Sequence, residues 1–212
     1  MLSAKILIAD DHEIFRKGIK QILSDMPDKY DIEEASNGSE VMKKISRNDF
    51  DMVLLDISMP GRNGIDILKQ LKNYRPDLQV LILSMYPEEQ FAVRALKAGA
   101  AGYLTKASKH DEFVTAVHRI LAGKKYISAS LANRLALYIR ADERKAPHET
   151  LSSREYEVMC MTASGKRVKQ IAMELSLSDK TISTYRSRIL NKLKMKNIAQ
   201  LIQYAINNRI VE

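Results

Sequence analysis

Short apolar segments alternate with amphipathic segments through the first 122 residues of the chain. The apolar segments predict five β-strands, near residues 5–9, 30–35, 52–56, 79–84 and 102–105. Between and after them, apolar residues at helical spacing predict five helices, near residues 12–24, 38–46, 64–74, 88–98 and 109–122. The third strand begins with four apolar residues in a row, as expected where helices cover both faces of a sheet. The alternation therefore predicts an α/β fold with a doubly wound parallel sheet and right-handed crossovers.

The pattern changes after residue 122. Residues 130–139 predict a short helix with Ser130 as its N-cap. Residues 140–150 are charged, contain Pro147 and have almost no large apolar side chain, so we expect a linker there.

A helical segment follows the linker. Four helices are predicted near residues 153–163, 168–175, 179–193 and 197–207. Ser152 and Glu155 have the spacing of a capping box at the start of the first of them. Only residues 176–178 separate the second helix from the third, with Ser178 as N-cap, so these two helices predict a helix-turn-helix.

The net charge of +8 is concentrated in the second half of the chain. Residues 1–120 carry 17 basic and 18 acidic side chains, whereas residues 121–212 carry 17 basic and 8 acidic ones. A basic second domain favours binding to a polyanion such as double-stranded DNA, although a solvated basic surface would have the same composition.

Composition also narrows the cellular setting. The chain has no run of eighteen apolar residues, so we expect no membrane span, and its start enters a strand directly, without a signal peptide. Its single cysteine, Cys160, excludes an internal disulfide and fits the reducing cytoplasm. We expect this thiol to be buried, because it lies in an apolar run.

Polar side chains follow four of the predicted strands. These are Asp10 and Asp11 after the first, Asp56 at the end of the third, Ser84 at the end of the fourth and Lys106 after the fifth. A single Asp after a strand is commonly a turn former or N-cap, but the carboxyl ends of parallel strands meet at one edge of the sheet. Three carboxylates gathered there need a counter-charge and suit a hard divalent ion such as Mg²⁺.

This set of residues resembles the phosphorylation site of a two-component response regulator receiver domain, and the resemblance extends over residues 3–122. It implies a flavodoxin-like sheet with strand order 2-1-3-4-5 and a sensor histidine kinase that phosphorylates Asp56. The implied metal-binding residues are Asp10, Asp11, Asp56 and Ser58, and the implied phosphoryl-contacting or responding residues are Lys106, Ser84 and Tyr103.

Within that site, the resemblance implies that Ser58 binds Mg²⁺ through its backbone carbonyl and that Asp10 acts through water. Ala107 stands where many receivers have a proline after a cis peptide bond. On the first helix, we expect Arg16, Lys17 and Lys20 to be solvent-exposed.

The third helix of the second segment has one apolar and one polar face. Ile182, Ile189 and Leu193 lie on the face that packs, with Leu190 at its margin. The opposite face and flank are typical of a helix that enters the DNA major groove, although a solvated helix looks similar. The expected DNA-contacting residues are Lys180, Thr181, Ser183, Thr184, Ser187, Arg188, Asn191 and Lys192.

Residues 150–212 resemble the LuxR-type DNA-binding domain, in particular the segments 151–158, 169–172 and 181–185. Val168 and Gln170 stand where Asn and Glu are common in that family. Joined to a receiver through a linker at 123–149, this domain implies a transcriptional regulator of the NarL/FixJ type. The resemblance implies an active homodimer, for which Ile198, Leu201 and Ile202 are candidates if they are not core residues, and RNA polymerase as a further partner.

Two other classes of protein remain open. A phosphohydrolase with an Asp nucleophile typically has a second Asp two residues later, where this chain has Ser58, so we do not expect an enzyme. The alternative is a DNA-binding regulator that acts without phosphorylation and has an inert receiver.

Overall fold

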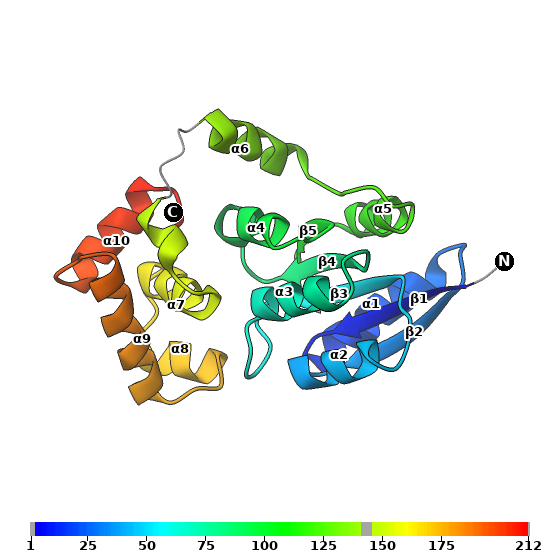
Figure 1. The fold of residues 1–212 in the computed structure, drawn as a ribbon, viewed down its shortest axis with the longest axis horizontal. Helices are drawn as coiled ribbons and strands as arrows, with labels where there is room; N and C mark the ends of the chain where they lie inside the picture. The colour runs from blue at the N-terminus through cyan, green and yellow to red at the C-terminus, as the bar shows by residue number, and fades with distance from the viewer. Residues whose placement is uncertain (1–2, 141–145, 212) are drawn as a thin grey trace. The chain divides into compact units, whose positions relative to one another are not determined.

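The computed structural model describes residues 3–140 and 146–211. The chain divides into two compact units, Met1–Ala132 and Asn133–Glu212. In the first part, the elements are β1 (Ala4–Ala9), α1 (Glu13–Asp25), β2 (Tyr30–Ala35), α2 (Gly38–Ile45), β3 (Met52–Asp56), α3 (Gly64–Tyr74), β4 (Gln79–Ser84), α4 (Glu88–Lys97), β5 (Gly102–Thr105), α5 (His110–Leu121) and α6 (Ala129–Arg140) (Figure 1). Each predicted boundary of these elements lies within one residue of the observed one.

The five strands form one parallel sheet in the order β2-β1-β3-β4-β5, which confirms the predicted fold class and strand order. The register pairs Ala9 of β1 with Leu55 of β3. It pairs Asp56 with Leu83 of β4, and Ser84 with Thr105 of β5. The four strand ends that carry polar residues therefore lie side by side at one edge of the sheet.

Helices cover both faces of the sheet. Alternate strand residues, among them Ile6, Ile8, Leu54 and Leu83, pack with Ile19 and Leu23 of α1 and with Phe113, Val117 and Ile120 of α5. Helices α2, α3 and α4 pack from the other side, where α3 lies against β3 and α4 against β5. Because both faces are covered, all five residues of β3 are buried, including Asp56.

The start of α6 differs from the prediction. Ser128, not Ser130, is the N-cap, because the Ser128 hydroxyl accepts a hydrogen bond from the Leu131 amide at 3.1 Å. The helix begins at Ala129, so Ser130 already lies within its first turn. The centre of the expected linker, residues 141–145, lies outside the described residues.

The second unit contains the part of α6 after Ala132, followed by η1 (Pro147–Thr150), α7 (Ser153–Ala163), α8 (Val168–Glu174), α9 (Asp179–Lys192) and α10 (Ile198–Asn207). The capping box of Ser152 and Glu155 is present at the start of α7, as predicted. Between α8 and α9 the backbone turns at Ser176, whose φ of +53° is unusual for a residue with a side chain. Ser178 then caps α9 by accepting a hydrogen bond from the Thr181 amide, which confirms the predicted helix-turn-helix.

Two smaller expectations are also answered by the structure. Cys160 is buried in α7, as predicted. Among the helices described here, none is both long enough and apolar enough to cross a membrane.

The position of Gly64 leads to a prediction about stability. A Cβ atom on Gly64 would collide with the Asp56 carbonyl oxygen and lie 2.6 Å from the Ile57 Cα, and these backbone atoms cannot move aside easily. We therefore expect Gly64→Ala to lower the free energy of unfolding by about 2 kcal/mol or more. Urea unfolding followed by circular dichroism measures this change.

Gly18 in α1 provides the matched control. It lies on the exposed side of α1, and an added Cβ would have no atom within 4 Å. Because alanine favours a helix interior over glycine, Gly18→Ala should raise the free energy of unfolding by about 0.5–1 kcal/mol. Equal effects of the two substitutions would contradict the steric role of Gly64.

Candidate functional site

The edge where the strands end brings a lysine between two carboxylates. Lys106, one residue after β5, places its Nζ 2.8 Å from Asp56 Oδ2 and 2.6 Å from Asp10 Oδ2. The side chains of these three residues are only 1–4% exposed. The ion pairs are therefore largely shielded from water. In the protein interior charges interact more strongly than in water, and an unpaired charge is costly.

Burial changes the acidity of this group of charges. It raises the pKa of Asp56 to about 6, against the opposing effect of Lys106 and with a further rise from Asp10. Burial also lowers the pKa of Lys106, but the negative charges of Asp56 and Asp10 outweigh this, so the net change is a rise. Lys106 is thus held as a cation against the carboxylates.

Asp11 and His12 add two further groups. The His12 Nδ1 lies 3.0 Å from Asp11 Oδ1 and 3.1 Å from Asp10 Oδ1. One candidate ligand atom from each of Asp10, Asp11, His12 and Asp56 can be chosen so that all lie within 4.8 Å of one another. The sequence did not indicate His12 as a site residue, because a side chain after an Asp-Asp pair can point toward the carboxylates or toward solvent.

The cluster fits a divalent cation. Asp10 Oδ2 and Asp11 Oδ1 are buried and have no hydrogen bond of good geometry, although they lie within ion-pair distance of Lys106 and His12, respectively. Three carboxylates against one ammonium group leave an excess of negative charge, and carboxylate oxygens are the ligands preferred by Mg²⁺. A bound cation would balance that excess.

Neighbouring residues hold this site in place. The Ser58 amide donates a hydrogen bond to Asp56 Oδ1 at 3.2 Å. The Phe15 ring lies beneath the Lys106 ammonium, 4.6 Å from its nitrogen to the ring centroid. Among the described residues no peptide bond is cis, so the bond before Ala107 is trans.

The expectation that Arg16 is solvent-exposed was wrong. Its side chain is only 14% exposed, donating one hydrogen bond to the Asp10 carbonyl oxygen at 2.8 Å and another to Glu34 Oε2 at 2.9 Å. Arg16 thereby fixes the backbone that carries the acidic residues. Hydrophobic periodicity assigns it to the outer side of α1 and cannot detect contacts with residues distant in sequence.

Ser84 and Tyr103 are connected through the backbone of Tyr86. The Ser84 hydroxyl accepts a hydrogen bond from the Tyr86 amide at 3.1 Å, and the Tyr103 hydroxyl donates to the Tyr86 carbonyl oxygen at 2.7 Å. Both Ser84 and Tyr103 are fully buried, and burial strongly raises the pKa of Tyr103. Tyr103 therefore points inward in this structure.

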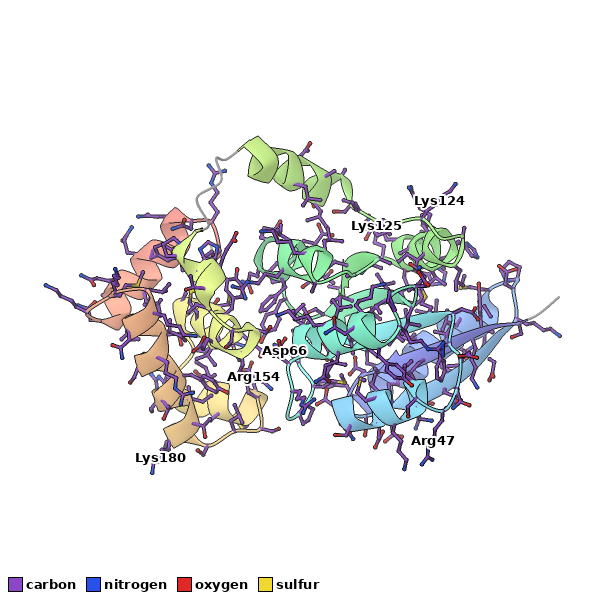
Figure 2. All side chains as sticks on the ribbon, in the orientation of Figure 1. Arg47, Asp66, Lys124, Lys125, Arg154 and Lys180 are labelled. Atoms are coloured by element: carbon purple, nitrogen blue, oxygen red, sulfur yellow. The ribbon has the colours of Figure 1, made fainter. Side chains whose placement is uncertain are left out.

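The second unit presents α9 as an exposed polar surface. Ile182, Ile189 and Leu193 are buried, as predicted for the apolar face of this helix. The residues expected to contact DNA are exposed, except that Thr181 is partly exposed. Figure 2 shows Lys180 extending away from the first turn of α9.

Several of these side chains already have partners within their own unit. The Thr184 hydroxyl donates to the Lys180 carbonyl oxygen and the Ser187 hydroxyl to that of Ser183, so each hydroxyl oxygen can still accept a hydrogen bond. Lys192 Nζ lies 2.6 Å from Glu155 Oε2, and Glu155 is only 5% exposed. The ion pair between Lys192 and Glu155 thus helps to hold α9 against α7. The sequence did not predict this contact.

The three apolar candidates on α10 differ in burial. Leu201 is fully buried and belongs to the core, whereas Ile198 and Ile202 are partly exposed. Ile206, four residues further on, is 45% exposed. An apolar stripe at i, i+4 and i+8 therefore remains on the surface of α10.

Two family models match the chain. The response regulator receiver domain matches residues 6–118, and the luxR family of bacterial regulatory proteins matches residues 149–205.

Related proteins match over nearly the whole length. The response regulator UvrY of Escherichia coli is 34% identical over 96% of this chain and 94% of its own length. The response regulator GacA of Pseudomonas aeruginosa is 34% identical over 98% of both chains. A solved structure of RcsB from Salmonella enterica, bound to a promoter in the presence of the phosphomimetic BeF3-, is 27% identical and covers 96% of this chain and 98% of that one, with a TM-score of 0.61.

The buried acidic cluster leads to a prediction for the metal-free protein. A pKa of about 6 for Asp56, against an ordinary value of 3.8, corresponds to about 3 kcal/mol of unfavourable free energy once the carboxyl is ionised. The attraction of Lys106 is already included in this pKa, and Asn resembles the protonated carboxyl, so we expect Asp56→Asn to stabilise the protein at pH 8 by about 1–3 kcal/mol.

The pH dependence provides the control. The folded protein retains the Asp56 proton to higher pH than the unfolded chain, so the cost develops between about pH 4 and pH 6 and is complete above that range. Thermal unfolding in the presence of a chelator should therefore show a larger advantage of Asp56→Asn at pH 8 than at pH 5. A variant less stable than the parent at pH 8 would contradict this account.

Proposed function

Because the chain belongs to the response regulators of the NarL/FixJ type, which join a receiver domain to a LuxR-type DNA-binding domain, we propose that phosphorylation of Asp56 by a sensor histidine kinase controls its binding to double-stranded DNA. The observation that carries this proposal is the position of Asp56, buried at the strand edge with Lys106 at 2.8 Å. We assign residues 3–122 to the receiver, 123–149 to the linker and 150–212 to the DNA-binding domain.

The proposed chemistry transfers a phosphoryl group. An oxygen of Asp56 attacks the phosphorus of a phosphohistidine, so that a P–O bond forms while the P–N bond breaks and the imidazole nitrogen leaves with the bond electrons. Lys106 stabilises the negative charge on the transferred oxygens, and the Ser58 amide orients the attacking carboxylate.

Magnesium fits the same site. Asp11, Asp56 and the Ser58 backbone carbonyl would hold the ion, with Asp10 acting through water, and when bound it supplies further positive charge for the phosphoryl oxygens.

The response to phosphorylation begins at Ser84. Its hydroxyl now accepts a hydrogen bond from Tyr86 and would instead bind the phosphoryl group. This change shifts a pre-existing equilibrium between two receiver conformations, in which the position of Tyr103 is coupled to that of Ser84 through Tyr86.

DNA recognition is assigned to α9. The exposed residues from Lys180 to Lys192 would enter the major groove, where cations contact phosphates and the hydroxyl oxygens of the exposed Thr184 and Ser187 accept hydrogen bonds from bases. An active homodimer would place two such helices on neighbouring half-sites, and Ile198 and Ile202 of α10 are candidates for the contact between protomers. At a promoter, RNA polymerase would be a further partner.

Phosphorylation at Asp56 is directly testable by intact mass. After incubation with Mg²⁺ and acetyl phosphate, the parent should gain the mass of one phosphoryl group and Asp56→Asn should gain none, because the attacking carboxylate is absent. Asp111→Asn is the matched control, since Asp111 is a fully exposed carboxylate of α5. Loss of phosphorylation in the control as well, or its retention in Asp56→Asn, would contradict the assignment.

A parent that gains no mass would favour the regulator with an inert receiver. Titration with beryllofluoride separates this outcome from rapid hydrolysis, because beryllofluoride binds a competent site without being hydrolysed.

The DNA-binding assignment predicts different roles for two cations of α9. Arg188→Ala should weaken binding to all sequences and reduce the slope of log affinity against log salt concentration by about 1, because one phosphate contact is lost. Lys192→Ala should weaken binding and also lower the unfolding temperature, because it leaves the buried Glu155 carboxylate without its ion pair. Fluorescence anisotropy over a range of salt concentrations and thermal unfolding measure both effects.

Ser183 and Ser187 provide the sequence-reading arm of the same experiment. Replacing either by alanine should change which sequences are preferred while leaving the salt dependence as in the parent. Unaltered preference in both variants would remove them as base contacts, and an unaltered salt slope in Arg188→Ala would remove its phosphate contact.

A further inference from the structure

Glu88, in the first turn of α4, binds the start of α6. Its Oε2 accepts a hydrogen bond from the Ser128 hydroxyl and another from the Ser130 hydroxyl, both at 2.6 Å. Hydrogen bonds to an ionised carboxylate are stronger than those between neutral groups and depend closely on geometry. All three residues lie in the first unit.

The helix α6 depends on this contact for its N-terminus. Ser128 caps the helix through the Leu131 amide, and its hydroxyl is held in turn by Glu88. The first turn of α6 has no acidic residue of its own. The Glu88 carboxylate therefore supplies, from another helix, the negative charge that stabilises a helix start.

The segment before α6 is attached to the same part of the receiver. The Tyr126 amide donates to the Ala101 carbonyl oxygen at 2.9 Å, and Tyr126 forms a parallel bridge with Gly102 at the edge of β5. Leu131 is fully buried, although its neighbours Ser130 and Ala132 are exposed. The start of the helix that leads to the second unit is thus fixed by several contacts.

The same part of the receiver adjoins the phosphorylation site. Ser84 is hydrogen-bonded to the backbone of Tyr86, and Pro87 then forms the N-cap of α4, so that Glu88 is the first residue of that helix. The Tyr103 hydroxyl donates to the Tyr86 carbonyl oxygen, only two residues before Glu88 in the chain. A continuous series of contacts therefore joins Ser84 to α6.

We propose that Glu88 is the positioning residue that couples the state of Asp56 to the start of α6, an inference that rests on the proposed function. When the Ser84 hydroxyl leaves the Tyr86 amide for the phosphoryl group, the N-terminus of α4 moves. Displacement by about 1 Å is enough to break hydrogen bonds of this length. The first turn of α6 then loses its cap support, and the start of this helix is released from α4.

Hydrogen–deuterium exchange of the first turn of α6, with and without beryllofluoride and Mg²⁺, tests this coupling in the full chain. In the parent, beryllofluoride should accelerate exchange of the Leu131 and Ala132 amides by about tenfold, as expected for the loss of one charged hydrogen bond. In Glu88→Gln and in the double variant Ser128→Ala/Ser130→Ala, exchange should already be fast without beryllofluoride and should no longer respond to it.

Glu112→Gln is the matched control, because Glu112 is an exposed carboxylate in the first turn of α5, and it should behave as the parent does. Slow exchange in Glu88→Gln would overturn the coupling. Fast exchange that still responds fully to beryllofluoride would overturn it as well, because a contact that only stabilises α6 would give that result. No beryllofluoride response in the parent would also overturn it.

Phosphoryl uptake, measured by mass on the same variants without beryllofluoride, separates this inference from the proposed function. Uptake in Glu88→Gln equal to that in the parent shows that the receiver is folded and competent, so the exchange data then bear on the coupling alone. Absence of both phosphoryl uptake and beryllofluoride binding in the parent would instead refute the phosphorylation of Asp56 and, with it, this inference.

Discussion

The ion pairs of Lys106 with Asp56 and Asp10 are the constraint on which the first unit depends. The parallel register brings the ends of β1, β3 and β5 together, and the helices on both faces keep their side chains from water. In that setting, an unbalanced negative charge is costly, so a bound cation would lower the free energy of the cluster. The features that make this edge unfavourable for stability also make it suitable for a switch.

Two groups of contacts extend outward from this edge. On one side, Arg16 and Phe15 of α1 hold Asp10 and Lys106 in place. On the other, Tyr86 joins Ser84 to the start of α4, where Glu88 binds the first turn of α6. The site is therefore held by α1 on one side and joined to the start of α6 through α4 on the other.

Periodicity and strand ends are local properties, and they predicted the elements and the gathering of Asp10, Asp56 and Lys106, whereas the strand order was implied by the resemblance to receiver domains. It did not predict contacts that depend on tertiary packing. The exposure of Arg16 was misjudged because its partner Glu34 lies on β2, 18 positions away. The Lys192 partner was missed because Glu155 lies 37 positions away. The cap of α6 was placed at Ser130 instead of Ser128, since both serines fit the local pattern equally well.

The most direct test of the account is the affinity for DNA with and without beryllofluoride, measured by fluorescence anisotropy on a duplex selected from a random pool. In the presence of Mg²⁺, beryllofluoride should change the affinity of the parent by about tenfold and should leave Asp56→Asn unchanged. A parent whose DNA affinity stays the same, although mass or titration shows its Asp56 site to be occupied, would contradict the claim that this carboxylate controls DNA binding.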